Sequence, residues 1–304
     1  MARTADSDLA PHELRVLVAV ADGAGFSAAA AALGLTQSAV SHSVRGSERK
    51  VGAVLFVRGR TGARPTPAGE RAVAHARRIL RMLDVLAAEA RGAASPDPAR
   101  GELRVAAFRS AALHLLPAAL RRLRDRHPGI EPRVRIVREV GRGAAGEVAD
   151  GKADLAVATL GGSAPLPSGL VVGGLFEEPY VLVHPPGHRA APGALPLVDW
   201  AENCGSYTRS WWATQDWIPP ATVEAEDDGA VLALVGAGHG MAIMPALSLT
   251  AAPAALRTTD LGPDRPTRRV GYVTTPELAA TTAIRALIRE LRADLPHGTL
   301  PARG

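Results

Sequence analysis

The N-terminal part of the chain carries the pattern that most constrains its fold. Apolar residues at helical spacing predict a first helix over residues 11–22. Ser27 is placed to cap a short second helix that ends at Gly34, and Thr36 is placed to cap a third that runs on to Gly52. Two short helices, a tight Gly-Leu turn and a third helix have the sequence form of a helix-turn-helix.

The third helix divides into two faces. Val40, Val44 and Val51 recur at helical spacing and are expected to point inward. The opposite face, near the N-terminal half, carries Gln37, Ser38, Ser41, His42 and Arg45. Arginine pairs with guanine and glutamine with adenine, and a recognition helix contacts bases with its N-terminal residues. These side chains are therefore candidates for DNA contact. The alternative is an ordinary solvated polar face.

An apparent strand and a Gly- and Arg-rich turn come next, as expected of a wing beside a recognition helix. Leu55 and Val57 are expected on one side of the strand. Basic side chains in the turn are suited to phosphates or a minor groove. Three arginines and the two capping residues complete the candidate DNA-binding set: Arg58, Arg60, Arg64, Ser27 and Thr36.

The charge distribution favours a polyanion-binding N-terminal module. The formal net charge is +5, and residues 1–100 carry all of it, with 14 Arg or Lys against 9 Asp or Glu. Residues 101–304 carry 21 of each sign. A basic head on a neutral body is typical of nucleic-acid binding. The alternative is a solvated basic face in an Arg-rich composition, since the chain has 33 arginines and two lysines.

A long helix is predicted over residues 67–91, after a DNA-binding domain of residues 1–66. Its apolar positions form a heptad seam of Ala72, Ala76, Ile79, Leu83, Leu86 and Ala90. A Pro-, Gly- and Ser-rich hinge over residues 92–101 follows. We expect the seam to pair with another chain as a dimer. The alternative is a helix packed on its own domain.

The segments TQSAVSHSVR, GAVLFVR and PTPAGE follow, in order and spacing, the signature of LysR-type transcriptional regulators, which the chain resembles over about residues 8–295. The resemblance implies a winged helix, a dimer through the linker helix, and a two-lobed sensor like the periplasmic binding proteins. It also implies a homotetramer on promoter DNA. Gly46 and Ser47 depart from the family's usual residues, and Gly in a helix costs about 1 kcal/mol relative to Ala. Ser38 and His42 also depart, so the operator cannot be copied from relatives.

The remaining chain, residues 102–304, predicts an α/β effector domain because strand and helix patterns alternate. The strand after residue 130 is expected to turn Val134 and Ile136 inward. We expect one lobe over about residues 102–172 and 269–304, and a second over about 173–268.

Ligands in open α/β sheets sit beyond the carboxyl ends of strands. The candidate effector-binding residues at such ends, and in a turn of the second lobe, are Arg109, Ser110, Arg142, Thr159, Tyr207, Thr208, Arg209, His239 and Gly240. The arginines suit a carboxylate, although each is also an ordinary surface arginine in this composition. Four tryptophans within residues 200–217 suggest either an aromatic effector or core packing.

Other function classes lack their signatures. The single cysteine, Cys204, excludes an internal disulfide framework and a multi-cysteine metal site, and favours a reducing, cytoplasmic setting. The start of the chain does not have the pattern of a secretory signal. No phosphate-binding loop, HExxH or GxSxG motif is present, and no cofactor is expected.

We therefore expect a DNA-binding regulator, not an enzyme, that responds to an anionic or aromatic small molecule. Two alternatives stay open. One is a DNA-binding regulator without an effector. The other is a small-molecule enzyme with a basic accessory domain, for which the sequence offers no paired acid and base.

Overall fold

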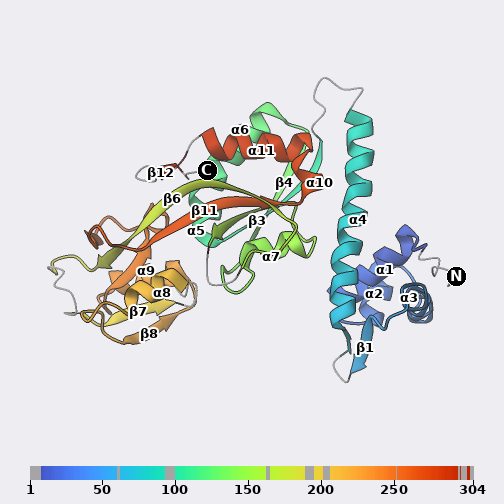
Figure 1. Cartoon of the computed structure of the whole chain (residues 1–304), viewed down its shortest axis with the longest axis horizontal. Coiled ribbons are helices and arrows are strands. Elements are labelled where there is room, and N and C mark those ends of the chain that lie inside the picture. Colours follow the sequence, from blue (N-terminus) through green and yellow to red (C-terminus); the bar gives the residue numbers. More distant parts are fainter. Residues whose placement is uncertain are drawn as a thin grey trace. The chain divides into compact units, whose positions relative to one another are not determined.

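The computed structural model describes residues 8–59, 62–92, 100–161, 165–188, 195–200, 206–250, 252–293, 295 and 300–301. Two compact units make up the chain (Figure 1). The first comprises residues 1–96 with 150–152, and the second residues 97–149 with 153–304.

The first unit begins with three helices: α1 (Pro11–Asp22), α2 (Phe26–Leu33) and α3 (Gln37–Val51). The predicted helix-turn-helix is therefore confirmed. Thr36 caps α3, since its hydroxyl accepts a hydrogen bond from the Ala39 amide at 3.2 Å. The prediction for Ser27 is wrong: Gly25 is the cap of α2, and Ser27 lies exposed inside the first turn.

The inward face of α3 differs from the prediction at its C-terminal end. Val40 and Val44 are buried against α1 and α2 as expected, but Val51 is 41% exposed. Ser47 is the third buried position instead. Positions 40, 44 and 47 follow the helical spacing, whereas Val51 is the last residue of the helix and lies beyond the core.

A two-stranded antiparallel wing follows, formed by β1 (Phe56–Gly59) and β2 (Gly62–Pro65). Leu55 is buried, but Val57 is 52% exposed, so the two do not share an inward face as predicted. The chain enters the strand one residue later than the pattern suggested. Gly62 lies so close to the α1–α2 turn that a Cβ there would be 2.2 Å from the Ala24 oxygen.

The long helix α4 (Pro67–Gly92) has the predicted extent, and the Thr66 hydroxyl accepts a hydrogen bond from the Gly69 amide at its start. Part of its heptad seam is buried and part is exposed. Ala72 packs on the first unit's core, and Ala76 is buried within the chain itself. At Ala72 the helix is therefore packed on its own domain, which was the alternative prediction. The exposed remainder of the seam consists of Ile79, Leu83, Leu86 and Ala90.

The second unit is built on one large sheet with strand order β10-β6-β11-β5-β3-β4 (Figure 1). Its first lobe contains the parallel strands β3 (Gly101–Ala107), β4 (Ile130–Ile136) and β5 (Leu155–Leu160). Its helices are α5 (Arg109–His114), α6 (Leu116–Arg126), α7 (Gly143–Ala149), α10 (Pro276–Ala279) and α11 (Thr282–Ala293).

Two long antiparallel strands, β6 (Val171–His184) and β11 (Thr267–Thr274), carry the sheet toward a second lobe. There β6 pairs with β9 (Ala242–Pro245) and β10 (Arg257–Asp260). The other elements of this lobe are β7 (Leu197–Trp200), α8 (Ser206–Trp212), β8 (Ala221–Ala225), α9 (Asp228–Gly236) and the short 3-10 helix η2 (Ala246–Leu249). The short β12 (Leu300–Pro301) also pairs with β6.

Val134 and Ile136 are exposed, at 42% and 53%, so the inward prediction is wrong. They lie on β4, an edge strand of the sheet. Trp200 and Trp212 are buried in two apolar clusters of the second lobe, so core packing accounts for them. Among the described helices, none is long and apolar enough to cross a membrane.

Candidate nucleic-acid interface and effector cleft

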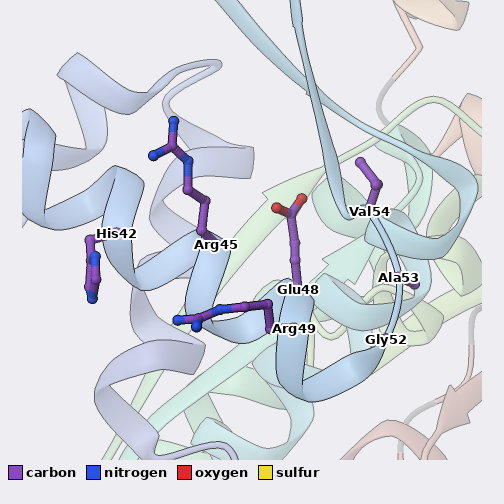
Figure 2. Close-up of a pocket in the computed structure, with 7 residues that line it drawn as sticks. All are labelled: His42, Arg45, Glu48, Arg49, Gly52, Ala53 and Val54. Atoms are coloured by element: carbon purple, nitrogen blue, oxygen red, sulfur yellow. The ribbon is translucent and has the colours of Figure 1, made fainter.

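The outer face of α3 presents the predicted polar residues together. Gln37, Ser38, His42 and Arg45 are exposed and Ser41 is partly so. One further residue was missed by the sequence analysis: Arg49 is exposed four positions after Arg45, which continues the same stripe. That spacing was the available signal. In Figure 2, His42, Arg45 and Arg49 project from successive turns of the helix.

A wide concavity of about 620 Å³ lies beside the C-terminal half of this stripe (Figure 2). Its walls come from His42, Arg45, Glu48 and Arg49 of α3 and from the loop over residues 52–54. The Glu48 carboxylate accepts hydrogen bonds from the Leu55 and Phe56 amides at 2.8 and 3.2 Å, which ties the start of the wing to the helix. The two arginines are therefore the charges that this surface presents to a polyanion.

The unusual Gly46 and Ser47 leave α3 unbroken. The buried Ser47 hydroxyl donates to the Ser43 carbonyl at 3.0 Å, so this hydroxyl is satisfied within the helix. One turn further, the Lys50 ammonium lies 2.6 Å from the Glu13 carboxylate, which also accepts from the Ala10 amide. The Lys50 bond holds the pKa of Glu13 below its usual range, despite an opposing effect of burial. These contacts link α1 to α3.

The structure describes the side chains of only some of the DNA-binding candidates in the wing and the second helix. Arg64 is exposed on β2, and Ser27 is exposed at the start of α2. Arg58 belongs to β1 by its backbone. Arg60 and Cys204 lie outside the described residues.

In the second unit, Arg109 joins the two lobes. Its guanidinium lies 2.6 Å from the Asp228 carboxylate and 3.9 Å from that of Asp227, both at the start of α9. A Cβ on Gly229 would be 2.4 Å from the Arg109 Nη2, so the guanidinium packs directly on the backbone there. Nearby His114 has its pKa lowered, chiefly by burial. Arg109 is thus engaged across the lobes by this chain's own carboxylates.

Ser110 is buried and faces another arginine rather than an open site. The Arg268 Nη2 lies 3.4 Å from the Ser110 Oγ and 2.6 Å from the Glu178 Oε1. Glu178 is fully buried and also accepts from the Leu247 amide at 2.6 Å. The Arg268 guanidinium lies 4.5 Å from the centroid of the Phe108 ring. Glu178 and Arg268 are cross-strand partners in β6 and β11. Through the contacts above, this pair joins both lobes to the two long strands.

Thr159 lies beside a carboxylate at the start of α7. Glu139 accepts hydrogen bonds from the Thr159 amide at 2.7 Å and from the Ala144 amide at 2.9 Å. Burial raises the pKa of Glu139, although these two bonds oppose the shift. Arg142 is exposed just before the helix.

On α8, Thr208 is buried beside Tyr180, whose pKa is raised mainly by burial. Arg209 makes a close ion pair with Asp199 and lies 4.5 Å from the centroid of the Trp212 ring. Tyr207 belongs to the helix by its backbone.

His239 and Gly240 lie at the other end of α9 from the Arg109 contact. Both follow the C-terminal end of α9, whereas the Arg109 contact lies at its N-terminal end. Gly240 serves packing, since a Cβ there would be 2.2 Å from the Pro196 oxygen. His239 is exposed.

A cavity of about 380 Å³ lies between the lobes. Arg138, which follows β4, lines it from the first lobe, and its guanidinium is 3.7 Å from Glu226. The walls from the second lobe are Asp199, Trp200, Arg209, Glu224, Ala225 and Glu226. Among the predicted effector residues whose side chains the structure describes, Arg209 is the one that lines this cavity.

Comparison with known proteins identifies both units. The family "LysR substrate binding domain" matches residues 96–296, and "Bacterial regulatory helix-turn-helix protein, lysR family" matches residues 11–70. The chain is 34% identical over 255 residues to the probable HTH-type transcriptional regulator LrrA of Synechococcus elongatus, over 79% of this chain and 82% of the relative.

Solved structures share the fold. Full-length OxyR from Pseudomonas aeruginosa superposes with a TM-score of 0.73 at 20% identity, over 97% of this chain and 99% of that one. Full-length CbnR complexed with its target DNA superposes with a TM-score of 0.61 at 20% identity, over 93% and 100%. With both family domains in order, the chain belongs to the LysR-type transcriptional regulators: it is a DNA-binding regulator with a small-molecule effector domain, not an enzyme.

Proposed function

We propose that α3 reads a specific operator through the stripe Gln37, Ser38, Ser41, His42, Arg45 and Arg49. The observation that carries the proposal is the continuous exposure of this stripe beside an Arg-lined concavity. The first residues, near the N-terminus of the helix, are suited to base edges, and Arg49, near its end, to a phosphate. Arg64 adds a phosphate contact from the wing, and the regulator acts on DNA in the cytoplasm.

We propose further that the cavity between the lobes holds the effector. It is lined by both lobes, so a bound molecule contacts each of them and favours one arrangement of the lobes over another. Differential affinity for two arrangements is what an effector needs in order to change DNA binding.

Self-association is supported by two exposed apolar surfaces. One is the outer part of the α4 seam, which includes Ile79, Leu83 and Leu86, at 49%, 38% and 68% exposed. The other is the β4 edge, with Val134 and Ile136. Unpaired strand edges and heptad seams both favour pairing with another chain. A dimer through α4 and a tetramer through a second contact are the assembly we propose.

The test of DNA recognition is selection of binding sites from a random duplex library by the full-length protein. Recovery of one interrupted palindrome, protected in footprinting of a genomic copy, supports the proposal. No enriched sequence would contradict it. Sedimentation of the wild type and of Leu83→Glu tests the assembly, with loss of the dimer expected in the variant. Repeating the footprint with a metabolite library separates an effector-responsive regulator from one without an effector.

A further inference from the structure

The charges around the cavity between the lobes point to the class of effector. This inference rests on the proposed function of that cavity. Among the residues that the structure describes, three carboxylates line it, from Asp199, Glu224 and Glu226, against the two guanidinium groups of Arg138 and Arg209. An added anion meets a surplus of negative charge there, whereas an added cation reduces it.

The basic groups of the cavity are already engaged. Arg138 faces Glu226 at 3.7 Å, and Arg209 makes its close pair with Asp199 while stacking on Trp212. The third arginine nearby, Arg109, is held by Asp228. To bind the Arg209 guanidinium, a carboxylate ligand would have to compete with the buried Asp199 carboxylate of this chain, which offsets part of the gain.

The starts of α7 and α9 are also supplied with acceptors from within the chain. Glu139, next to Arg138 in sequence, fills the start of α7 through the Ala144 amide. Asp227, next to Glu226, accepts from the Ala230 amide at 2.9 Å and caps α9. These are the positions at which a helix would otherwise attract an anionic ligand.

Glu224 differs from the other charges of the wall. It is exposed on β8 and has no ion-pair partner among the residues that the structure describes. Trp200 also lines the cavity, but it is only 4% exposed and packs with Val223 and Ala225 in the core of the second lobe. An unpaired carboxylate in the wall of a cavity is a favourable setting for an ammonium or guanidinium group.

We propose that the effector is a small organic cation or a zwitterion whose positive group binds at Glu224. This replaces the anionic effector expected from the sequence. The proposal concerns ligand charge, so it is tested with molecules of equal length and different charge. The four-carbon series of 1,4-diaminobutane, 4-aminobutyrate and succinate provides this contrast.

The measurement is calorimetric binding of each probe to the full-length protein, with sodium chloride at matched ionic strength as the blank. We expect affinity in the order diamine, amino acid, succinate. Glu224→Gln is expected to weaken diamine binding by at least about tenfold, a difference of about 1.4 kcal/mol. Glu131→Gln, which alters an exposed carboxylate on β4, is the matched control and is expected to bind as the wild type does.

Tighter binding of succinate, absence of diamine binding, or equal loss in Glu224→Gln and Glu131→Gln would overturn the proposal. Footprinting with the diamine then separates the claim of a cation site from the claim of an effector response. Binding that depends on Glu224 but leaves the footprint unchanged would keep the cation site and contradict the proposed effector response.

Discussion

The recognition helix and the effector cleft use charge in opposite ways. On α3, Arg45 and Arg49 stand exposed on a helix face, and the one carboxylate beside them, that of Glu48, is bound to backbone amides. In the cleft, Arg109, Arg138 and Arg209 each have a carboxylate partner from the same chain. The α3 surface presents positive charge to a polyanion, whereas the arginines of the cleft are already paired with carboxylates of the same chain. An arginine therefore indicates an anionic ligand only where its partners are known.

The largest effect is expected at the buried pair of Glu178 and Arg268, which tests whether the arginines of the second unit are bound by the chain's own carboxylates. Glu178→Ala leaves the Arg268 charge buried without its partner, so we expect a loss of about 3–5 kcal/mol in the free energy of unfolding. Urea unfolding of the full-length protein measures it. Asp260→Ala breaks an exposed pair with Arg265 and is expected to cost no more than about 1 kcal/mol. Similar small losses in both variants would contradict a structural role for the buried pair.

Arg45→Ala tests the other side of the comparison. Loss of a base contact is expected to cost about 1–3 kcal/mol of binding to the selected operator and to relax specificity at one position. The stability of the protein is expected to be unchanged, because the side chain is exposed. Arg49→Ala is the matched variant, for which we expect weaker binding to all duplexes alike. Uniform weakening by Arg45→Ala would instead make Arg45 a phosphate contact.

Gly46→Ala sharpens the account of the recognition helix. A Cβ at this position would meet only the Glu13 Oε1, at 3.8 Å, so alanine fits. We expect a gain of up to about 1 kcal/mol in the free energy of unfolding, from helix propensity. Gly52→Ala is the control, since Gly52 has φ of 74° and alanine is strained there. A destabilised Gly46→Ala variant would show that the glycine serves packing.

The smallest expected effect is on pH dependence. The pKa of Glu13 is lowered in the folded state by Lys50, so this carboxylate stabilises the fold above its unfolded pKa of about 4.5. That contribution is lost as the pH falls through the lower, folded value. Lys50→Met is expected to remove less than about 1 kcal/mol at neutral pH and nearly nothing in strong acid. Thermal unfolding at the two pH values measures it, and an equal loss at both would contradict the assignment.

The sequence predicted those features that depend on neighbours along the chain. The polar stripe of α3 and the Thr36 cap follow from helical spacing and local hydrogen bonding. The cleft does not follow in this way. Arg109 meets Asp228 across 119 positions, and Arg268 meets Ser110 across 158. No periodicity encodes such pairs, so the sequence offered Arg109 as an anion site although its carboxylate partner lay elsewhere in the fold.

Errors at the edges of elements have a similar cause. Val51, Val57, Val134 and Ile136 fit an apolar pattern but are exposed. A pattern assigns a residue to a face and does not show whether another element covers that face. On β4, which is an edge strand, burial of Val134 and Ile136 depends on contacts with other elements or with another chain.

The most direct test of the central claim is a salt titration of full-length protein binding to the selected operator and to a scrambled duplex of equal length. We predict at least about a thousandfold preference for the operator at physiological salt, with affinity for both duplexes falling steeply as salt rises. Equal affinity for the two duplexes at every salt concentration would contradict the claim that α3 reads sequence.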